Sequence, residues 1–363
     1  MIYLDNGATS FVKPPRVYAA VQTAIRTCAN VGRGGYPAAM QAAQTVLACR
    51  QQAARLFFCK PEQVVFTHNC THGLNMAINT LVRPGAQVAV SGFEHNAVMR
   101  PLYARGAKLK ICGRKLFDPD DTLSHWEDAL KQGVDCAVFT HCSNVFGYIL
   151  PIEEMAQLCK QYGVPYIIDA AQSAGVLPVT LGDADFVAMP GHKGLLGPQG
   201  TGILLCNRIP APLLSGGTGT DSIAKTMPDF LPEAGEAGTL NVPGIAGLRW
   251  GLDYILQRKT DTILYTEQKQ VRLCAHGLQK LGYRVFHGEH QTGTLSFVPP
   301  GDCEEFAGKL ARKGIAVRAG LHCAPLAHES AGTLDSGTVR VSFGHDATST
   351  QTRALLTACR TLS

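Results

Sequence analysis

The segment DFVAMPGHKG, residues 185–194, sets a lysine between glycines directly after a short apolar run. Short apolar runs bounded by proline and glycine are typical of buried strands. A lysine in the turn that follows is ordinarily a solvated surface charge. Whether Lys193 has a chemical role therefore depends on what lies at the ends of the other strands of the chain.

Similar short runs alternate with amphipathic helical patterns through the first two thirds of the chain. Strand and helix in alternation predict a mainly parallel sheet covered on both faces, hence the α/β class. We expect seven strands in this sheet, at residues 64–67, 87–91, 108–112, 136–141, 165–169, 185–189 and 201–206.

The pattern changes at Pro243, where a long helical stretch begins. Strands are expected again at residues 295–298 and 339–343, with helices between and after them. We therefore divide the chain into an N-terminal arm with a large domain, residues 1–243, and a smaller α+β domain, residues 244–363.

Composition restricts the partners of the chain. A net charge of +5 over 363 residues, without clustered basic residues, gives no reason to expect nucleic acid or an anionic membrane. Neither a secretory leader nor a membrane-spanning run is recognised, so a cytoplasmic protein is expected. The thirteen cysteines are odd in number and show no zinc-site spacing, so we expect reduced thiols and no metal.

Polar residues follow several of the expected strands, at the edge where ligands bind to open α/β sheets. They are His95, Asn144, Asp169, Gln172 and Lys193. Four of them have an ordinary interpretation when taken alone: His95 as a loop histidine, Asn144 as a turn former, Asp169 as a helix cap and Lys193 as a surface charge. Together they predict a functional site.

A lysine and a carboxylate facing one crevice suit pyridoxal 5'-phosphate. The lysine forms a Schiff base, and the carboxylate holds the ring nitrogen protonated. The phosphate requires free N–H groups at a helix start, which the segment HNCTHGLNMAI, residues 68–78, provides at Cys70 and Thr71. An ordinary helix cap at Thr71 is the alternative.

Motifs along nearly the whole chain resemble the class V aminotransferase group of fold-type I pyridoxal phosphate enzymes, in its cysteine desulfurase and selenocysteine lyase branch. The motifs are YLDNGATS (3–10), ANVGRGGY (29–36), FEHNAV (93–98), HCSNVFG (141–147), IIDAAQSAG (167–175), PGHKG (190–194), EAGTLNVPG (236–244), VRAGLHCAPLAH (317–328) and VRVSFG (339–344).

The resemblance implies roles for the residues around the cofactor. Lys193 would be the Schiff-base lysine and proton shuttle, Asp169 would pair with the pyridine nitrogen, and Gln172 would bond the phenolic oxygen. His95 would stack on the ring and assist proton transfer. Asn144 would contact cofactor and substrate.

The phosphate would be held by Thr71, Cys70 and His192, with Thr239 reaching in from a second subunit of a homodimer. Pro190 departs from the family, in which a serine hydroxyl commonly binds the phosphate. Proline has neither that hydroxyl nor a backbone N–H, so we expect this phosphate contact to be lost.

The reaction expected from the resemblance converts L-cysteine to L-alanine and leaves the sulfur on Cys323 as a persulfide. A thiolate is a suitable nucleophile for this step. Arg340 would bind the substrate carboxylate, and we expect His322 and His328 to influence the pKa of Cys323. A sulfur-acceptor protein or a small thiol would then take the sulfur.

Other functions remain open at this point. A selenocysteine lyase would act on L-selenocysteine by the same chemistry. An aminotransferase or epimerase of the same fold would not need Cys323. A pyridoxal phosphate-binding regulator is disfavoured because no DNA-binding segment is appended.

Overall fold

A seven-stranded sheet forms the centre of the computed structural model, which describes residues 1–32, 34–220 and 222–362. The strand order is β2-β8-β7-β6-β5-β3-β4, and only β8 runs antiparallel to its neighbours. The expected α/β class and the mainly parallel seven-stranded sheet are confirmed. Its strands are β2 (Val64–Thr67), β3 (Gln87–Ser91), β4 (Lys108–Cys112), β5 (Cys136–Thr140), β6 (Tyr166–Asp169), β7 (Phe186–Pro190) and β8 (Gly202–Cys206).

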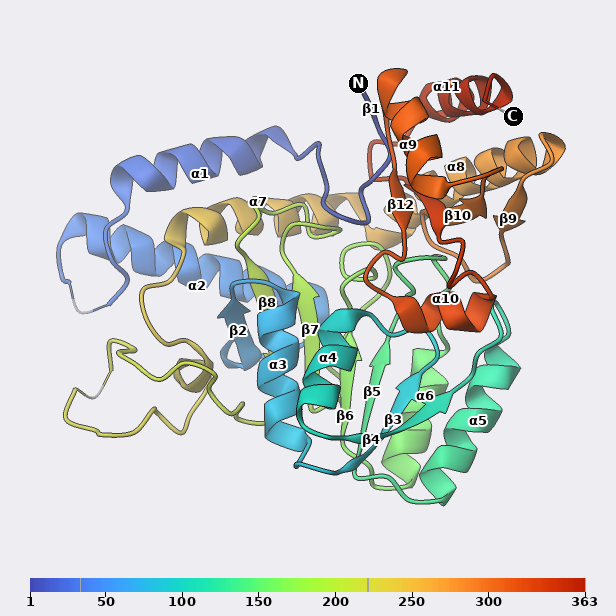
Figure 1. The fold of residues 1–363 in the computed structure, drawn as a ribbon. Helices are drawn as coiled ribbons and strands as arrows, with labels where there is room; N and C mark the ends of the chain where they lie inside the picture. Colours follow the sequence, from blue (N-terminus) through green and yellow to red (C-terminus); the bar gives the residue numbers. More distant parts are fainter. Residues whose placement is uncertain (33, 221, 363) are drawn as a thin grey trace.

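Helices cover both faces of this sheet (Figure 1). The buried side chains of one face pack against α2 (Pro37–Phe57), α5 (Pro119–Lys131), α6 (Ile152–Gln161) and α7 (Val242–Arg258). Those of the other face pack against α3 (Cys70–Leu81) and α4 (Asn96–Ala104). Strands covered on both faces read as continuous apolar runs, which is why the sequence located each of them to within one residue.

A four-stranded antiparallel sheet, β12-β13-β10-β9, forms a second core with α8, α9 and α11, whose bounds are given below. The N-terminus lies in this part of the molecule (Figure 1), where β1 (Ile2–Tyr3) pairs in parallel with β11 (Ile315–Ala316). The remaining elements are α1 (Pro15–Thr27), η1 (Pro61–Gln63), η2 (Glu233–Gly235), α8 (Thr260–Lys280), β9 (Arg284–Phe286), β10 (Thr294–Val298), α9 (Cys303–Arg312), β12 (Arg318–Gly320), α10 (Pro325–Ala331), β13 (Thr338–Ser342) and α11 (Ser349–Arg360).

The domain division at residues 243 and 244 stays a prediction. Helix α7 follows this position, yet it packs against α1 and α2, and its buried residues join the core of the large sheet. This packing favours a division after Arg258 instead. Among the helices in the described ranges, none is both long and apolar enough to cross a membrane.

A buried ion pair links α2 to the long segment that precedes α7. Arg50 donates from both terminal nitrogens to the two carboxylate oxygens of Glu236, at 2.9 Å each, and the side chains are 9% and 8% exposed. Glu236 Oε1 also accepts the backbone N–H of Phe66 in β2 at 2.7 Å. This carboxylate therefore joins α2, β2 and residues 207–241.

We expect Glu236→Ala to lower the free energy of unfolding by about 3–5 kcal/mol, because Arg50 would keep a buried charge without a partner. Denaturant unfolding of the purified protein measures this loss. The matched control is Asp183→Ala, which removes the carboxylate of an exposed pair with Lys160 and should cost about 1 kcal/mol or less. Equal losses for the two variants would contradict a stabilising role for the buried pair.

Candidate active site

Lys193 lies just beyond the carboxyl end of β7, in a turn with no room for side chains at its glycines. A Cβ on Gly191 would lie 2.0 Å from Thr201 Oγ1, and one on Gly194 would lie 2.4 Å from the carbonyl oxygen of Ala174. Within the described chain the amine of Lys193 makes no hydrogen bond and no ion pair. Burial lowers the pKa of Lys193 below its usual range, although the nearby Asp169 acts in the opposite direction.

Asp169 ends β6, the strand beside β7, and is 2% exposed. Its Oδ1 accepts the N–H of Ala171 at 2.8 Å and the thiol of Cys70, with sulfur and oxygen 3.6 Å apart. Its Oδ2 accepts no hydrogen bond from the residues described. Burial raises the pKa of Asp169, while the Ala171 N–H and the Lys193 charge oppose the rise. One carboxylate oxygen is thus held in place and the other is available.

The N-terminus of α3 carries free donors beside Asp169. The helix cap is Asn69, whose side chain accepts the N–H of His72 at 2.9 Å, so the alternative of a cap at Thr71 is wrong. The N–H groups of Cys70 and Thr71 and the Thr71 hydroxyl donate to no described residue. Such groups, at the positive end of a helix dipole, are suited to an anion.

Two histidines of the site are held neutral. Burial, reinforced by the charge of Lys193, lowers the pKa of His95 to about 4 and that of His192 also to about 4. His95 Nδ1 accepts the N–H of Ala97 at 3.0 Å, so its remaining ring nitrogen bears the proton. His192 Nδ1 lies 3.0 Å from Thr9 Oγ1.

A single cavity brings most of the expected residues together. It is lined by Cys70, Thr71, His95, Asn144, Asp169, Gln172, Pro190, His192 and Lys193, among others. The side-chain amide of Gln172 donates one hydrogen bond to the carbonyl oxygen of Gly7, at 3.0 Å. Arg340, Cys323 and Thr239 do not line this cavity.

Arg340 lies on β13 and is 1% exposed. One terminal nitrogen pairs with Asp5 Oδ1 at 2.6 Å, and the other donates to the carbonyl oxygen of Asn144 at 3.0 Å. Arg340, expected to bind the substrate carboxylate, therefore contacts Asn144 in the wall of the cavity and is already paired with Asp5.

Cys323 lies in a loop fastened to the rim of the same cavity. Asn144 Nδ2 donates to the carbonyl oxygen of His322 at 2.8 Å, and the N–H of Asn96 donates to that of Cys323 at 2.8 Å. His322 and Cys323 have φ values of 50° and 57°, a left-handed conformation that costs non-glycine residues about 1–2 kcal/mol each. These two anchors hold the strained loop next to His95.

His322 and His328 do not supply a positive charge to Cys323. Burial, together with the charge of Arg340, lowers the pKa of His322 to about 2, and burial lowers that of His328 to about 4. The cation beside the thiol is Arg318, whose NH2 group lies 3.9 Å from the sulfur.

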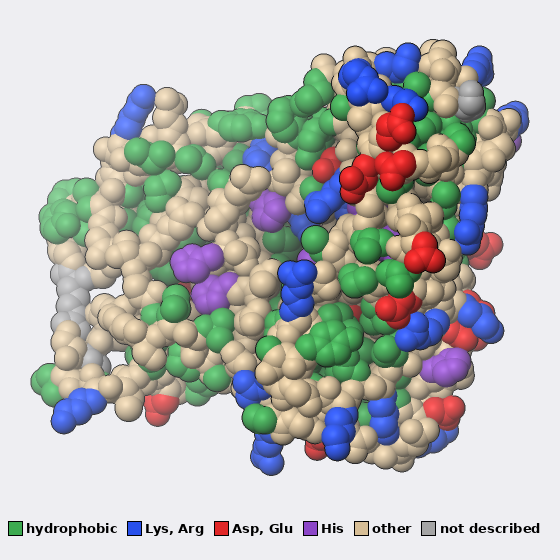
Figure 2. Space-filling view, in the orientation of Figure 1, with side chains coloured by type: hydrophobic (Ala, Val, Ile, Leu, Met, Phe, Trp, Pro, Cys, Tyr) green, Lys and Arg blue, Asp and Glu red, His purple; other side chains and the backbone are tan. Residues whose placement is uncertain are grey.

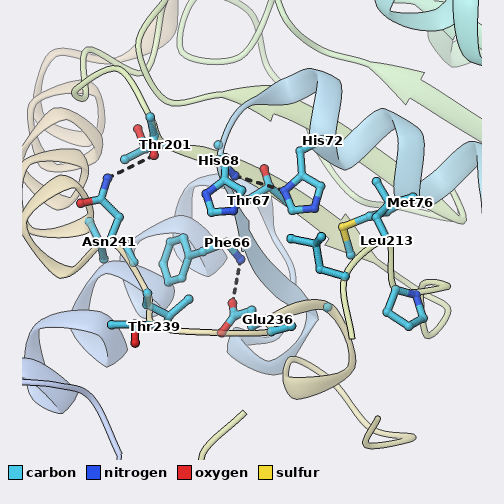
Figure 3. A pocket seen from close by; sticks show the side chains of 18 residues that line it. Phe66, Thr67, His68, His72, Met76, Thr201, Leu213, Glu236, Thr239 and Asn241 are labelled. Carbon is cyan, nitrogen blue, oxygen red and sulfur yellow. Dashed lines mark hydrogen bonds between the residues drawn. The ribbon is translucent and has the colours of Figure 1, made fainter. Parts of the chain in front are cut away.

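Thr239 lies in a different cavity, shown in Figure 3. There it accompanies Phe66, His68, Glu236 and Asn241. Thr239 itself is exposed and lies on the segment that precedes α7. Its hydroxyl makes no hydrogen bond to any residue in the described ranges. A role for Thr239 at the Lys193 cavity of the same chain is not supported by this position.

Sequence reasoning missed Asp5, Asn96 and Arg318, although each lies within a motif already quoted. Their contacts join segments far apart in the chain, as with Asp5 and Arg340. No local pattern signals such pairs. Arg33, within the motif 29–36, lies outside the described residues.

The family model and the most similar curated proteins point to the same family. The Aminotransferase class-V family matches residues 2–355. A probable cysteine desulfurase of Pyrococcus abyssi is 33% identical, over 94% of this chain and 89% of that protein. A cysteine desulfurase of Salmonella choleraesuis is 31% identical, over 89% and 84%.

Solved structures of the same kind superpose closely. The apo cysteine desulfurase of Thermococcus onnurineus NA1 gives a TM-score of 0.93 at 30% identity, covering 99% of this chain and 94% of that one. A cysteine desulfurase of Escherichia coli gives 0.85 at 27% identity, covering 98% and 93%. The fold matches these fold-type I structures, and the chain belongs to the aminotransferase class-V family, alongside proteins named cysteine desulfurases.

Proposed function

We propose that the chain is a pyridoxal 5'-phosphate-dependent cysteine desulfurase that converts L-cysteine to L-alanine and takes the sulfur on Cys323. The observation that carries the proposal is the state of Cys323. All thirteen cysteines lie among the described residues, and Cys323 alone is exposed. Its loop is anchored to Asn96 and Asn144, at the rim of the Lys193 cavity.

The residues of the cavity fit the cofactor. The free amine of Lys193 would hold it, and the free Oδ2 of Asp169 would bind the ring nitrogen. The unused N–H groups of Cys70 and Thr71, with the Thr71 hydroxyl and His192, would bind the phosphate. These donors compensate for Pro190, which offers none. Gln172 has a second amide N–H for the phenolic oxygen, and the neutral ring of His95 would stack on the cofactor.

When bound, the cofactor supplies an electron sink that makes the substrate α-proton acidic. Lys193 suits the transfer of this proton, because burial lowers its pKa and favours the neutral amine. We assign the substrate carboxylate to Arg340. Asn144 is hydrogen-bonded to Arg340 and to the Cys323 loop, so it would position both relative to the substrate.

Cys323 performs the sulfur transfer. Its thiolate attacks the substrate sulfur, a sulfur–sulfur bond forms, and the carbon–sulfur bond breaks. The electron pair stays with the carbon, which is protonated to become the methyl group of L-alanine. Arg318 places a positive charge beside the reacting sulfur. Exposure of Cys323 then allows an acceptor protein or a small thiol to remove the outer sulfur.

We further propose a homodimer in which Thr239 binds the phosphate of the partner's cofactor. Large apolar side chains are exposed on the N-terminal arm, on α1 and on the segment that carries Thr239. They include Phe11, Tyr18, Leu214, Ile223 and Phe230. Figure 2 shows fewer charged side chains on this side than over the C-terminal part. A shared site and an apolar surface both favour a two-fold dimer.

We expect Cys323→Ala to lose at least about a hundredfold in desulfuration rate, since a covalent nucleophile is removed. The cofactor absorbance should be retained, because no cavity-lining residue changes. Sulfide release is the measurement, with Cys59→Ala as a control that alters a half-buried thiol elsewhere. Sulfide release by Cys323→Ala at the wild-type rate would show that Cys323 is not the nucleophile, whereas a wild-type protein that releases no sulfide would favour an aminotransferase or epimerase. Parallel assays with L-selenocysteine separate a selenocysteine lyase.

Light scattering should give about twice the chain mass of 38.8 kDa. Leu214→Glu, which sets a charge at the proposed interface, should increase the monomer fraction and weaken cofactor retention. Tyr265→Glu on α8 is the matched control, because it alters a large exposed residue outside that segment, 63% exposed against 55% for Leu214. A fully active monomer would rule out the shared site.

A further inference from the structure

Asp5 forms an ion pair with Arg340, the residue to which we assign the substrate carboxylate. Arg340 is 1% exposed and packs against Gly7, where an added Cβ would lie 3.3 Å from Arg340 Cζ. One terminal nitrogen of Arg340 donates a hydrogen bond to Asp5 Oδ1, and the other donates to the carbonyl oxygen of Asn144. Its Nε is buried and has no acceptor among the described residues. Asp5 therefore already balances the charge of this buried guanidinium, which a substrate carboxylate would have to take over.

The backbone of Asp5 is held by hydrogen bonds, whereas its side chain is partly exposed to solvent. The Asp5 carbonyl oxygen accepts the N–H of Ala8 at 3.0 Å and the hydroxyl of Tyr3 at 3.0 Å, and the residue forms a bridge with Ser342 of β13. The side chain is 20% exposed, while that of Arg340 is 2% exposed. The carboxylate of Asp5 thus already lies partly in contact with solvent, on a backbone that is held in place.

Resting on the function proposed above, we propose that Asp5 is a specificity-determining residue, an internal stand-in for the substrate carboxylate that the substrate displaces from Arg340. A buried guanidinium is costly without an anion, and Asp5 supplies that anion until the substrate arrives. The exchange replaces one carboxylate by another, so the charge in contact with Arg340 stays the same. A ligand without a carboxylate cannot complete this exchange.

The opposite arrangement makes a different prediction. If Asp5 only orients Arg340 and stays bound during turnover, removing its charge should misplace the guanidinium and weaken substrate binding. The sign of the change in ligand affinity therefore separates a competitor from an orienting residue.

The decisive variant is Asp5→Asn in the holoenzyme, which keeps the size of the side chain and an oxygen acceptor but removes the competing charge. Binding of L-alanine, followed by cofactor absorbance, should tighten by about fivefold, equivalent to about 1 kcal/mol. Binding of L-alaninamide, which lacks the carboxylate, should not tighten. The KM for L-cysteine should fall by more than kcat changes. Weaker or unchanged L-alanine binding would overturn the proposal.

Two further variants complete the design. Asp183→Asn removes one negative charge from the exposed pair with Lys160 and should leave L-alanine binding unchanged. Arg340→Lys loses the planar fork and should weaken L-alanine binding. If Arg340→Lys has no effect, the substrate site proposed for Arg340 fails. If it weakens binding while Asp5→Asn does not tighten it, only the role of Asp5 fails.

A crystal structure of the wild-type holoenzyme with L-alanine tests the exchange without any variant. We expect the ligand carboxylate on Arg340, with the Asp5 carboxylate turned toward solvent. A retained contact between Asp5 and Arg340, with the ligand carboxylate bound elsewhere, would contradict the exchange.

Discussion

The rest of the site depends on the burial of one amine at the carboxyl edge of the sheet. Lys193 has no partner for its amine among the described residues, and desolvation favours its neutral form. The close approach of Gly191 to Thr201 and of Gly194 to Ala174 makes this burial possible. Asp169 lies on the adjacent strand, and burial in the same cavity lowers the pKa of His95 and that of His192 to about 4, which keeps both rings neutral.

The C-terminal part adds groups that the parallel sheet lacks. Arg340 and the Cys323 loop are both fastened to Asn144, which follows β5. His322 and Cys323 have strained, left-handed backbone conformations. Hydrogen bonds from Asn144 and Asn96 stabilise the loop in this conformation. Under the proposed function, Asn144 would couple substrate binding to sulfur transfer, so a change at Asn144 should disturb both.

Strands and strand ends were accessible from sequence because their signals are local. The run before Pro190 predicted β7 to within one residue, and the polar residues after four strands proved to share a cavity. Their chemical roles remain proposals. The sequence does not tell which unit helix α7 belongs to, because an amphipathic pattern does not show what covers its apolar face. The same limit applies to Thr71, since Asn69 is an equally good helix cap. Asp5 could not be found this way, because 335 residues separate it from Arg340.

The central claim is that Lys193 holds the cofactor, and borohydride reduction of the holoprotein tests it most directly. Reduction fixes the cofactor covalently to the amine that binds it, and peptide mapping by mass spectrometry then identifies that amine. The account predicts the label on the peptide that contains Lys193. A label on another lysine, or no covalent label at all, would contradict it.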